Sequence, residues 1–128
     1  MTKKPLGSFS DLLGHTIAQI EWRKNWGYDR SDELIFTLED GEKYKLYHDQ
    51  DCCESVLIED IAGDLESVLR SAIQLAEVVS NSGGVVGDGT YTWTFYKLVT
   101  HFGTVTIRWY GTSNGYYSEE VRWAKVDD

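Results

Sequence analysis

Proline, methionine and cysteine are scarce in this chain, and it has no long apolar run. The 128 residues include one proline, one methionine and two cysteines. No stretch approaches the roughly 20 continuous apolar residues that cross a bilayer. The opening residues 1–10 lack the apolar run of a signal peptide. We therefore expect a protein that stays in the cytoplasm and makes no membrane contact.

Basic residues are also few. Lys and Arg together number 12 against 21 Asp and Glu, which gives a formal net charge of −9. A charge of this sign repels phosphate backbones, so direct binding to long nucleic acid is disfavoured. The same charge would attract a partner with a basic surface, although solubility alone is the simpler explanation for it.

The two cysteines are adjacent, at Cys52 and Cys53. A disulfide between neighbours closes a strained eight-membered ring, so we expect two thiols, as in a reducing compartment. With His48 and Asp51 they are the candidate metal ligands. Neighbouring strand residues point to opposite faces, however, and a metal site usually separates paired cysteines. We therefore expect no bound metal.

The sequence also lacks recognisable enzyme motifs. A thiol enzyme would need a base such as His48 or His101 beside a cysteine, and spacing alone does not show one. The glycine-rich stretch lacks the GxxxxGK[ST] pattern of a phosphate loop. No cofactor is expected, and we favour a protein that is not an enzyme.

Aromatic residues, in contrast, are plentiful, with five Trp, eight Tyr and four Phe. Alternating runs of aromatic and β-branched residues predict an α+β fold that is mainly antiparallel β, with about seven strands in hairpins and a meander. The expected strands span residues 16–22, 32–38, 43–47, 55–61, 90–100, 104–110 and 116–126. Asp40-Gly41 between the second and third is a strong hairpin signal.

The remaining segments complete a single domain over residues 1–128. Asp64 can cap a short helix over about residues 64–70. That pattern also permits one helix to residue 80, but we favour the short helix followed by a strand. Residues 1–10 are expected to form a flexible tail, and the glycine-rich residues 81–89 a mobile loop or a ligand flap.

The densest mixture of donors, aromatics and turn residues lies in the segment 108–119. Its candidate binding residues are Arg108, Trp109, Tyr110, Ser113, Asn114, Tyr116, Tyr117 and Glu119. Arginine can pair with an anion, and the rings offer stacking faces. The alternative is a plain hairpin, in which Trp109 and Tyr117 pack in the core and Arg108 pairs with Glu119 or Glu120 across strands.

Three segments resemble a family of short uncharacterised proteins of bacteriophages and bacteria. They are HDQDCCESVLIEDIAGDL (48–65), TWTFYK (92–97) and TIRWYGTSNGYYSEEV (106–121). The paired cysteines before an acidic strand, and RWYG followed by SNGYYSE, carry the resemblance. The family would have a Gly-Ser-Pro-Ile type of break where this chain has Arg70-Ser71-Ala72-Ile73. The resemblance implies a strand after that break and no established activity.

From these observations we expect a non-enzymatic, phage-type accessory protein that binds and modulates or inhibits a host protein, for example in counter-defence. One alternative is a protein that binds or sequesters a small nucleotide-like signal through the segment 108–119. Another is a thiol- or metal-dependent enzyme. A homodimer formed through exposed aromatic residues is a further option.

Overall fold

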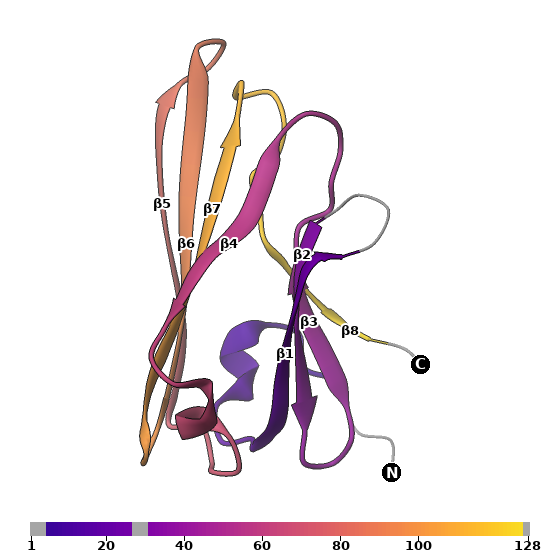
Figure 1. Cartoon of the computed structure of the whole chain (residues 1–128), viewed down its shortest axis with the longest axis vertical. Helices are drawn as coiled ribbons and strands as arrows, with labels where there is room; N and C mark the ends of the chain where they lie inside the picture. Colours follow the sequence, from indigo (N-terminus) through magenta and orange to yellow (C-terminus); the bar gives the residue numbers. More distant parts are fainter. Residues whose placement is uncertain (1–4, 27–30, 127–128) are drawn as a thin grey trace.

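The protein is a sandwich of two antiparallel sheets of four strands each (Figure 1). The computed structural model describes residues 5–26 and 31–126. The first sheet has the order β1 (Ile17–Trp26), β2 (Ser31–Leu38), β3 (Lys43–Tyr47), β8 (Arg122–Lys125). The second has the order β4 (Ser55–Ala62), β7 (Gly103–Ser113), β6 (Gly89–Thr100), β5 (Leu75–Val85). The mainly antiparallel β prediction is confirmed, with eight strands where about seven were expected.

No α-helix occurs in the described residues. The helical elements are two single 3₁₀ turns, η1 (Phe9–Leu12) and η2 (Leu65–Val68). No helix in the described ranges is long and apolar enough to span a membrane. The helical part of the α+β prediction is therefore wrong, and the domain is mainly β.

The β2–β3 hairpin forms as the sequence predicts. Leu34, Phe36 and Leu38 face the core on β2, and Tyr44 and Leu46 face it on β3. The turn between them contains Gly41 at φ +92°, a left-handed conformation that glycine adopts without steric cost. Alternation at period 2 and a permissive turn residue are both local properties, so the sequence alone predicts this hairpin.

The expected three-strand meander at the C-terminus is wrong. The hairpin of β6 and β7 forms, with Leu98 opposite Val105. The chain then leaves this sheet, and β8 pairs with β3 of the other sheet, where Trp123 lies opposite Leu46. There Trp123 stacks on Tyr44 at a centroid distance of 5.1 Å. Aromatic packing between these two paired strands therefore stabilises β8 in the first sheet.

The helix expected near residues 64–70 is reduced to η2. Asp64 caps this turn as expected, because its Oδ1 accepts a hydrogen bond from the Glu66 amide at 3.1 Å. The turn cannot continue, since Arg70 adopts φ +62° and its amide donates to the Ile17 carbonyl at 2.8 Å. The strand expected after it is present as β5, which begins at Leu75.

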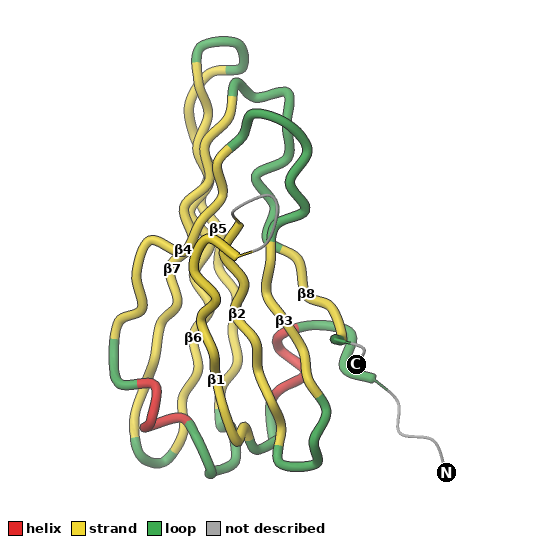
Figure 2. The backbone as a smooth tube through the Cα atoms, turned by 45° about the vertical axis from the view of Figure 1, so that its right-hand side comes forward, coloured by secondary structure: helices red, strands yellow, loops and turns green. Residues whose placement is uncertain are grey.

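Most of residues 81–89 belong to strands instead of a loop. β5 runs to Val85 and β6 begins at Gly89, so only three residues connect them. Gly84, at φ +94°, allows this close pairing, because a Cβ there would lie 2.3 Å from the Gly89 oxygen. The resulting hairpin projects beyond the rest of the molecule (Figure 2).

The flexible tail expected over residues 1–10 falls partly outside the described residues, and the described part of it packs on the core. Residues 1–4 lie outside the described part of the chain, but Phe9 is buried in the core. Its ring packs edge-on against Tyr96 of β6 at 4.9 Å. The rest of the core fills the space between the sheets, and its largest fully buried side chains are Trp109, Tyr44, Phe36, Leu12, Ile17, Leu34 and Leu46.

Candidate functional site

The predicted binding segment 108–119 does not form one surface. Side chains alternate along β7, so Trp109 points into the core while Arg108 and Tyr110 point to the outer face of the second sheet. Ser113, Tyr117 and Glu119 lie on the inner side, around a cleft. The structure therefore separates these residues into the core, the outer face of the second sheet and the cleft.

Arg108 pairs with Asp60 on β4, the neighbouring strand. Its Nε donates to Asp60 Oδ1 at 2.5 Å, and a second guanidinium nitrogen contacts Oδ2. The expected alternative pairing with Glu119 or Glu120 is wrong, because those residues lie on the other side of the sheet. The hydrogen bonds from Arg108 lower the pKa of the Asp60 carboxyl. Arg108 is thus already matched with an anion of its own chain.

Tyr110 belongs to an apolar surface that we call the aromatic face. Its members point outward from the four strands of the second sheet: Leu57, Val79, Tyr91, Trp93, Phe95 and Tyr110. Trp93 is at its centre, 4.5 Å from the Tyr110 ring and stacked on Phe95 at 5.9 Å. No other element of the described chain covers this face (Figure 1). Val79 is 53% exposed, and Leu57 and Tyr91 are also exposed.

The sequence predicts a strand that contains Trp93 and Phe95, but it does not single them out as site residues. The run TWTFYKL (92–98) indicates this surface. On a strand, Trp93 and Phe95 point to one face and Tyr96 and Leu98 to the other, so both faces carry aromatic or apolar side chains. A strand in a two-layer sandwich needs only one apolar face. An aromatic set on both faces therefore marks a surface that does more than fill the core.

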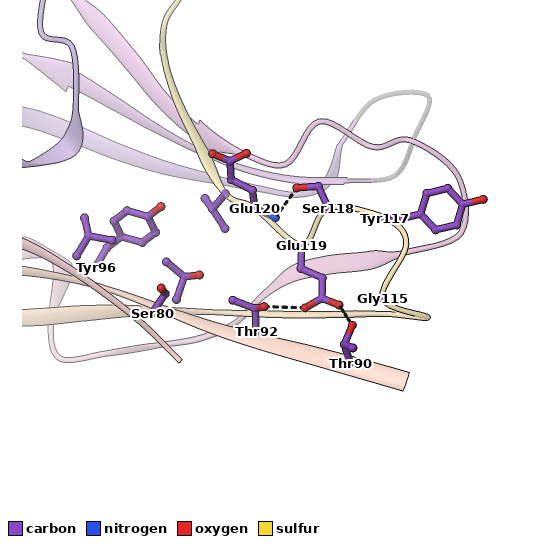
Figure 3. A pocket seen from close by; sticks show the side chains of 12 residues that line it. Ser80, Thr90, Thr92, Tyr96, Gly115, Tyr117, Ser118, Glu119 and Glu120 are labelled. Carbon is purple, nitrogen blue, oxygen red and sulfur yellow. Dashed lines mark hydrogen bonds between the residues drawn. The ribbon is translucent and has the colours of Figure 1, made fainter. Parts of the chain in front are cut away.

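Glu119 fixes the segment that follows β7. Its carboxylate accepts hydrogen bonds from the hydroxyls of Thr90 at 2.5 Å and Thr92 at 2.7 Å (Figure 3). The Ser113 hydroxyl donates to the same carboxylate at 2.6 Å. Burial alone would raise the pKa of Glu119, but these hydroxyl groups outweigh burial and lower it. The carboxylate is consequently charged at neutral pH, and Tyr117 lines the same cleft.

Asn114 and Tyr116 form the tip of the connection from β7. Asn114 Oδ1 accepts from the Tyr116 amide at 2.9 Å, which makes the turn that the sequence indicates. Gly115 packs closely against the β5–β6 turn, because a Cβ atom at this position would lie 2.8 Å from Val86 Cα. Tyr116 itself is 73% exposed and points away from the cleft.

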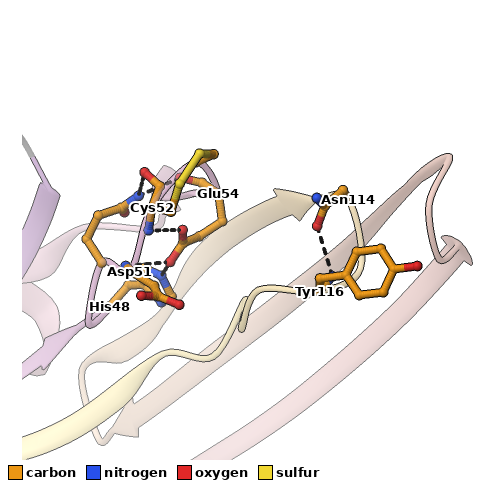
Figure 4. Close-up of a disulfide and its surroundings, with 8 residues drawn as sticks. His48, Asp51, Cys52, Glu54, Asn114 and Tyr116 are labelled. Carbon is orange, nitrogen blue, oxygen red and sulfur yellow. Dashed lines mark hydrogen bonds and ion pairs between the residues drawn. A yellow bond between two sulfur atoms is a disulfide. The ribbon is translucent and has the colours of Figure 1, made fainter.

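The metal-ligand candidate His48 is buried and contacts the buried carboxylate of Glu54. His48 Nε2 lies 2.8 Å from Glu54 Oε2 (Figure 4). His48 Nδ1 lies 2.7 Å from the Glu120 carbonyl oxygen. Both ring nitrogens are thus engaged by oxygen atoms of this chain and are not free to ligate a metal. The amides of Asp51 and Cys52 donate to the same carboxylate at 2.8 and 2.9 Å.

These contacts determine the charge state of Glu54. Burial would raise its pKa, but the two backbone amides and His48 outweigh burial and lower it to about 2. Glu54 is therefore an ionised carboxylate in an almost fully buried position. The three donors to its two oxygens hold the loop between β3 and β4 in place.

The expectation of two thiols is wrong, because Cys52 and Cys53 form a disulfide. The expectation assumed strand geometry, in which neighbouring side chains diverge. Here the two residues lie in a bend that folds around Glu54, and both are exposed. Neither cysteine carries a free thiol to ligate a metal. Within residues 5–26 and 31–126, no group of three or more potential ligands is arranged to hold an ion.

Comparison with known proteins identifies the family. The model of a domain of unknown function, DUF7448, matches residues 10–123, and the chain belongs to this family. No curated protein and no solved structure matches the chain.

Proposed function

We propose that this DUF7448 protein is a non-enzymatic binding protein that docks its aromatic face onto a basic host protein and modulates that protein. The observation that carries the proposal is the uncovered cluster of Trp93, Tyr110 and Phe95 on a rigid sheet. A phage-type accessory role in the host cytoplasm is part of this proposal and follows from the family resemblance alone.

The aromatic face has the composition of a protein-binding surface. Single exposed apolar residues are ordinary in a folded protein, but a contiguous patch marks an interaction surface. Trp, Tyr and Arg are the residues that dominate binding energy at interfaces, and Arg108 borders the patch. Because hydrogen-bonded strands hold these side chains, little conformational entropy is lost when a partner binds.

Charge favours a basic partner. The chain has a net charge of −9, whereas Arg108 at the aromatic face is neutralised by Asp60. The patch can therefore be desolvated at modest cost, while the surrounding negative field attracts and orients a positively charged protein.

The nucleotide-like ligand has less support from the geometry. Its proposed anion partner, Arg108, is paired with Asp60 on the outer face. Ser113, Tyr117 and Glu119 lie on the opposite face of that sheet, so the residues do not converge on one ligand. A protein partner needs no such convergence.

The test uses the protein that co-purifies in equal amount from the host, isolated and titrated back by calorimetry. We expect the double variant Trp93→Ala, Tyr110→Ala to weaken binding at least about 30-fold, since two central aromatic side chains are lost. Tyr116→Ala, which removes an exposed ring elsewhere, is the matched control and should leave the affinity unchanged.

Three results would contradict the proposal. They are an unchanged affinity of the double variant, the absence of any stoichiometric partner, and a dimer mass in solution that the double variant abolishes. The last result would assign the aromatic face to a second copy of this chain.

A further inference from the structure

A second surface lies on the opposite, inner face of the same sheet. Where β5 and β6 extend past the first sheet, their inner face and the segment 115–121 enclose an open cleft of about 470 Å³ (Figure 3). This volume lies within the range of about 300–1,000 Å³ that is typical of small-molecule sites. Its walls include Val78, Ser80 and Val121, together with the hydroxyl and carboxyl groups described below.

Two hydroxyl groups in this cleft have no assigned role. Tyr96 and Thr94 are only 4% and 7% exposed, and both line the cleft. Among the residues that the structure describes, no hydrogen bond is made by Tyr96 Oη or Thr94 Oγ1. Among the described residues, the polar side-chain atoms that are both inaccessible to solvent and without a hydrogen bond are the indole nitrogens of Trp22 and Trp109, and the Tyr96 and Thr94 oxygens are not among them. The Tyr96 and Thr94 oxygens therefore remain accessible from the cleft, and buried polar groups of this kind usually have a partner.

The charged side chains of the cleft walls are acidic. Glu119 and Glu120 line the cleft, and no Lys, Arg or His is among the described residues of its walls. The Glu120 carboxylate also lies 3.7 Å from Nε of Arg122, a residue outside these walls. The hydroxyls that hold Glu119 keep it ionised, as described above. Burial, and then the negative charge of Glu120, raise the pKa of Tyr96, so its hydroxyl stays protonated and can both donate and accept. A phosphate or carboxylate ligand would be repelled here.

We propose that this cleft binds a compact organic cation, a guanidinium or a primary ammonium group on a short apolar stem. The cation would lie near Glu119 and donate to Thr94 Oγ1 and Tyr96 Oη. Val78 and Val121 line the same cleft and would contact the stem. A guanidinium has only donors, and each of these oxygens can accept.

This inference does not depend on the proposed function, because the cleft and the aromatic face lie on opposite sides of one sheet. Variants of one surface leave the other intact. Failure of either proposal can therefore be recognised separately.

The test is a titration of the ¹⁵N-labelled full chain, followed by the amide shifts of residues 90–96. Arginine amide is the first probe, and citrulline amide, which has almost the same shape without the charge, is its control. We expect citrulline amide to bind at least about tenfold more weakly. The capped peptide acetyl-Gly-Arg-Gly-amide distinguishes the source: weaker binding than arginine amide indicates a free metabolite, and equal or tighter binding a protein side chain.

Two conservative variants locate the site. Tyr96→Phe and Thr94→Val each remove one hydroxyl and should weaken arginine amide binding by about two- to tenfold. Tyr91→Phe removes a hydroxyl from the outer face of the same strand and should have no effect. Equal binding of the two amides, unchanged affinity in both cleft variants, or shifts confined to other residues would overturn the proposal.

Discussion

Replacing Glu54 with glutamine should remove the part of the acid sensitivity of this fold that comes from its buried carboxylate. In the native protein the pKa of Glu54 is lowered from an ordinary 4.5 to about 2. The difference of about 2.5 corresponds to about 3 kcal/mol of stability, at about 1.4 kcal/mol for each pKa unit. Because the folded pKa is the lower one, this contribution is complete above about pH 4.5 and is lost as the pH falls through about 2.

The Glu54→Gln variant keeps the shape of the side chain but loses its charge and one acceptor oxygen. The amides of Asp51 and Cys52 and the ring of His48 then compete for a single carbonyl. We expect the free energy of unfolding at neutral pH to fall by about 2–3 kcal/mol. The gap between the two proteins should narrow steadily as the pH is lowered from about 4.5 towards 2.

Urea unfolding followed by far-ultraviolet circular dichroism at several pH values measures both quantities. Asp51→Asn is the matched control, because Asp51 is exposed and contributes its backbone amide, not its carboxylate, to the network. Its stability should change by less than about 0.5 kcal/mol. The reasoning would be refuted if Glu54→Gln lowered the free energy of unfolding by less than about 0.5 kcal/mol. It would also be refuted if the difference in free energy of unfolding between the variant and the native protein stayed constant down to acid pH.

Two backbone positions give further predictions. Arg70→Gly should stabilise the protein by about 0.5–1 kcal/mol in thermal unfolding, because it relieves φ +62°. Arg70→Ala is the control, because alanine keeps that strained conformation and only loses the exposed ion pair with Glu66. A gain in stability for Arg70→Ala as large as that for Arg70→Gly would contradict the strain argument. Gly84→Ala should cost at least about 2 kcal/mol, since it adds a clash with the Gly89 oxygen to an unfavourable φ. Gly87→Ala, at φ +93° in open space, should cost about 1 kcal/mol, and equal losses at both glycines would exclude the clash.

Local patterns account for the parts of the fold that the sequence predicts. The β2–β3 and β6–β7 hairpins follow from alternation and short turns within about twenty residues. The position of β8 does not follow from such patterns. It depends on Trp123 stacking on Tyr44, a contact between residues far apart in the chain. Sequence reasoning had no information on which sheet would bury that ring.

The candidate site shows a related limit. The segment 108–119 was treated as one surface because its residues are close in sequence. Alternation along β7 sends Trp109 inward and Arg108 outward, and the same rule would have separated them beforehand. The partner of Arg108, Asp60, lies 48 residues away on β4, beyond the reach of any local pattern.

The pairing of β8 with β3 also has a consequence for the order of assembly. All four strands of the second sheet are contiguous in sequence, whereas the first sheet combines the N-terminal strands with the last one. Near the two ends of the chain, Trp123 Nε1 donates to the Leu6 carbonyl at 3.0 Å. The second sheet can therefore form from contacts within residues 55–113 alone, whereas the first sheet is complete only when β8 returns to β3 across the whole length of the second sheet.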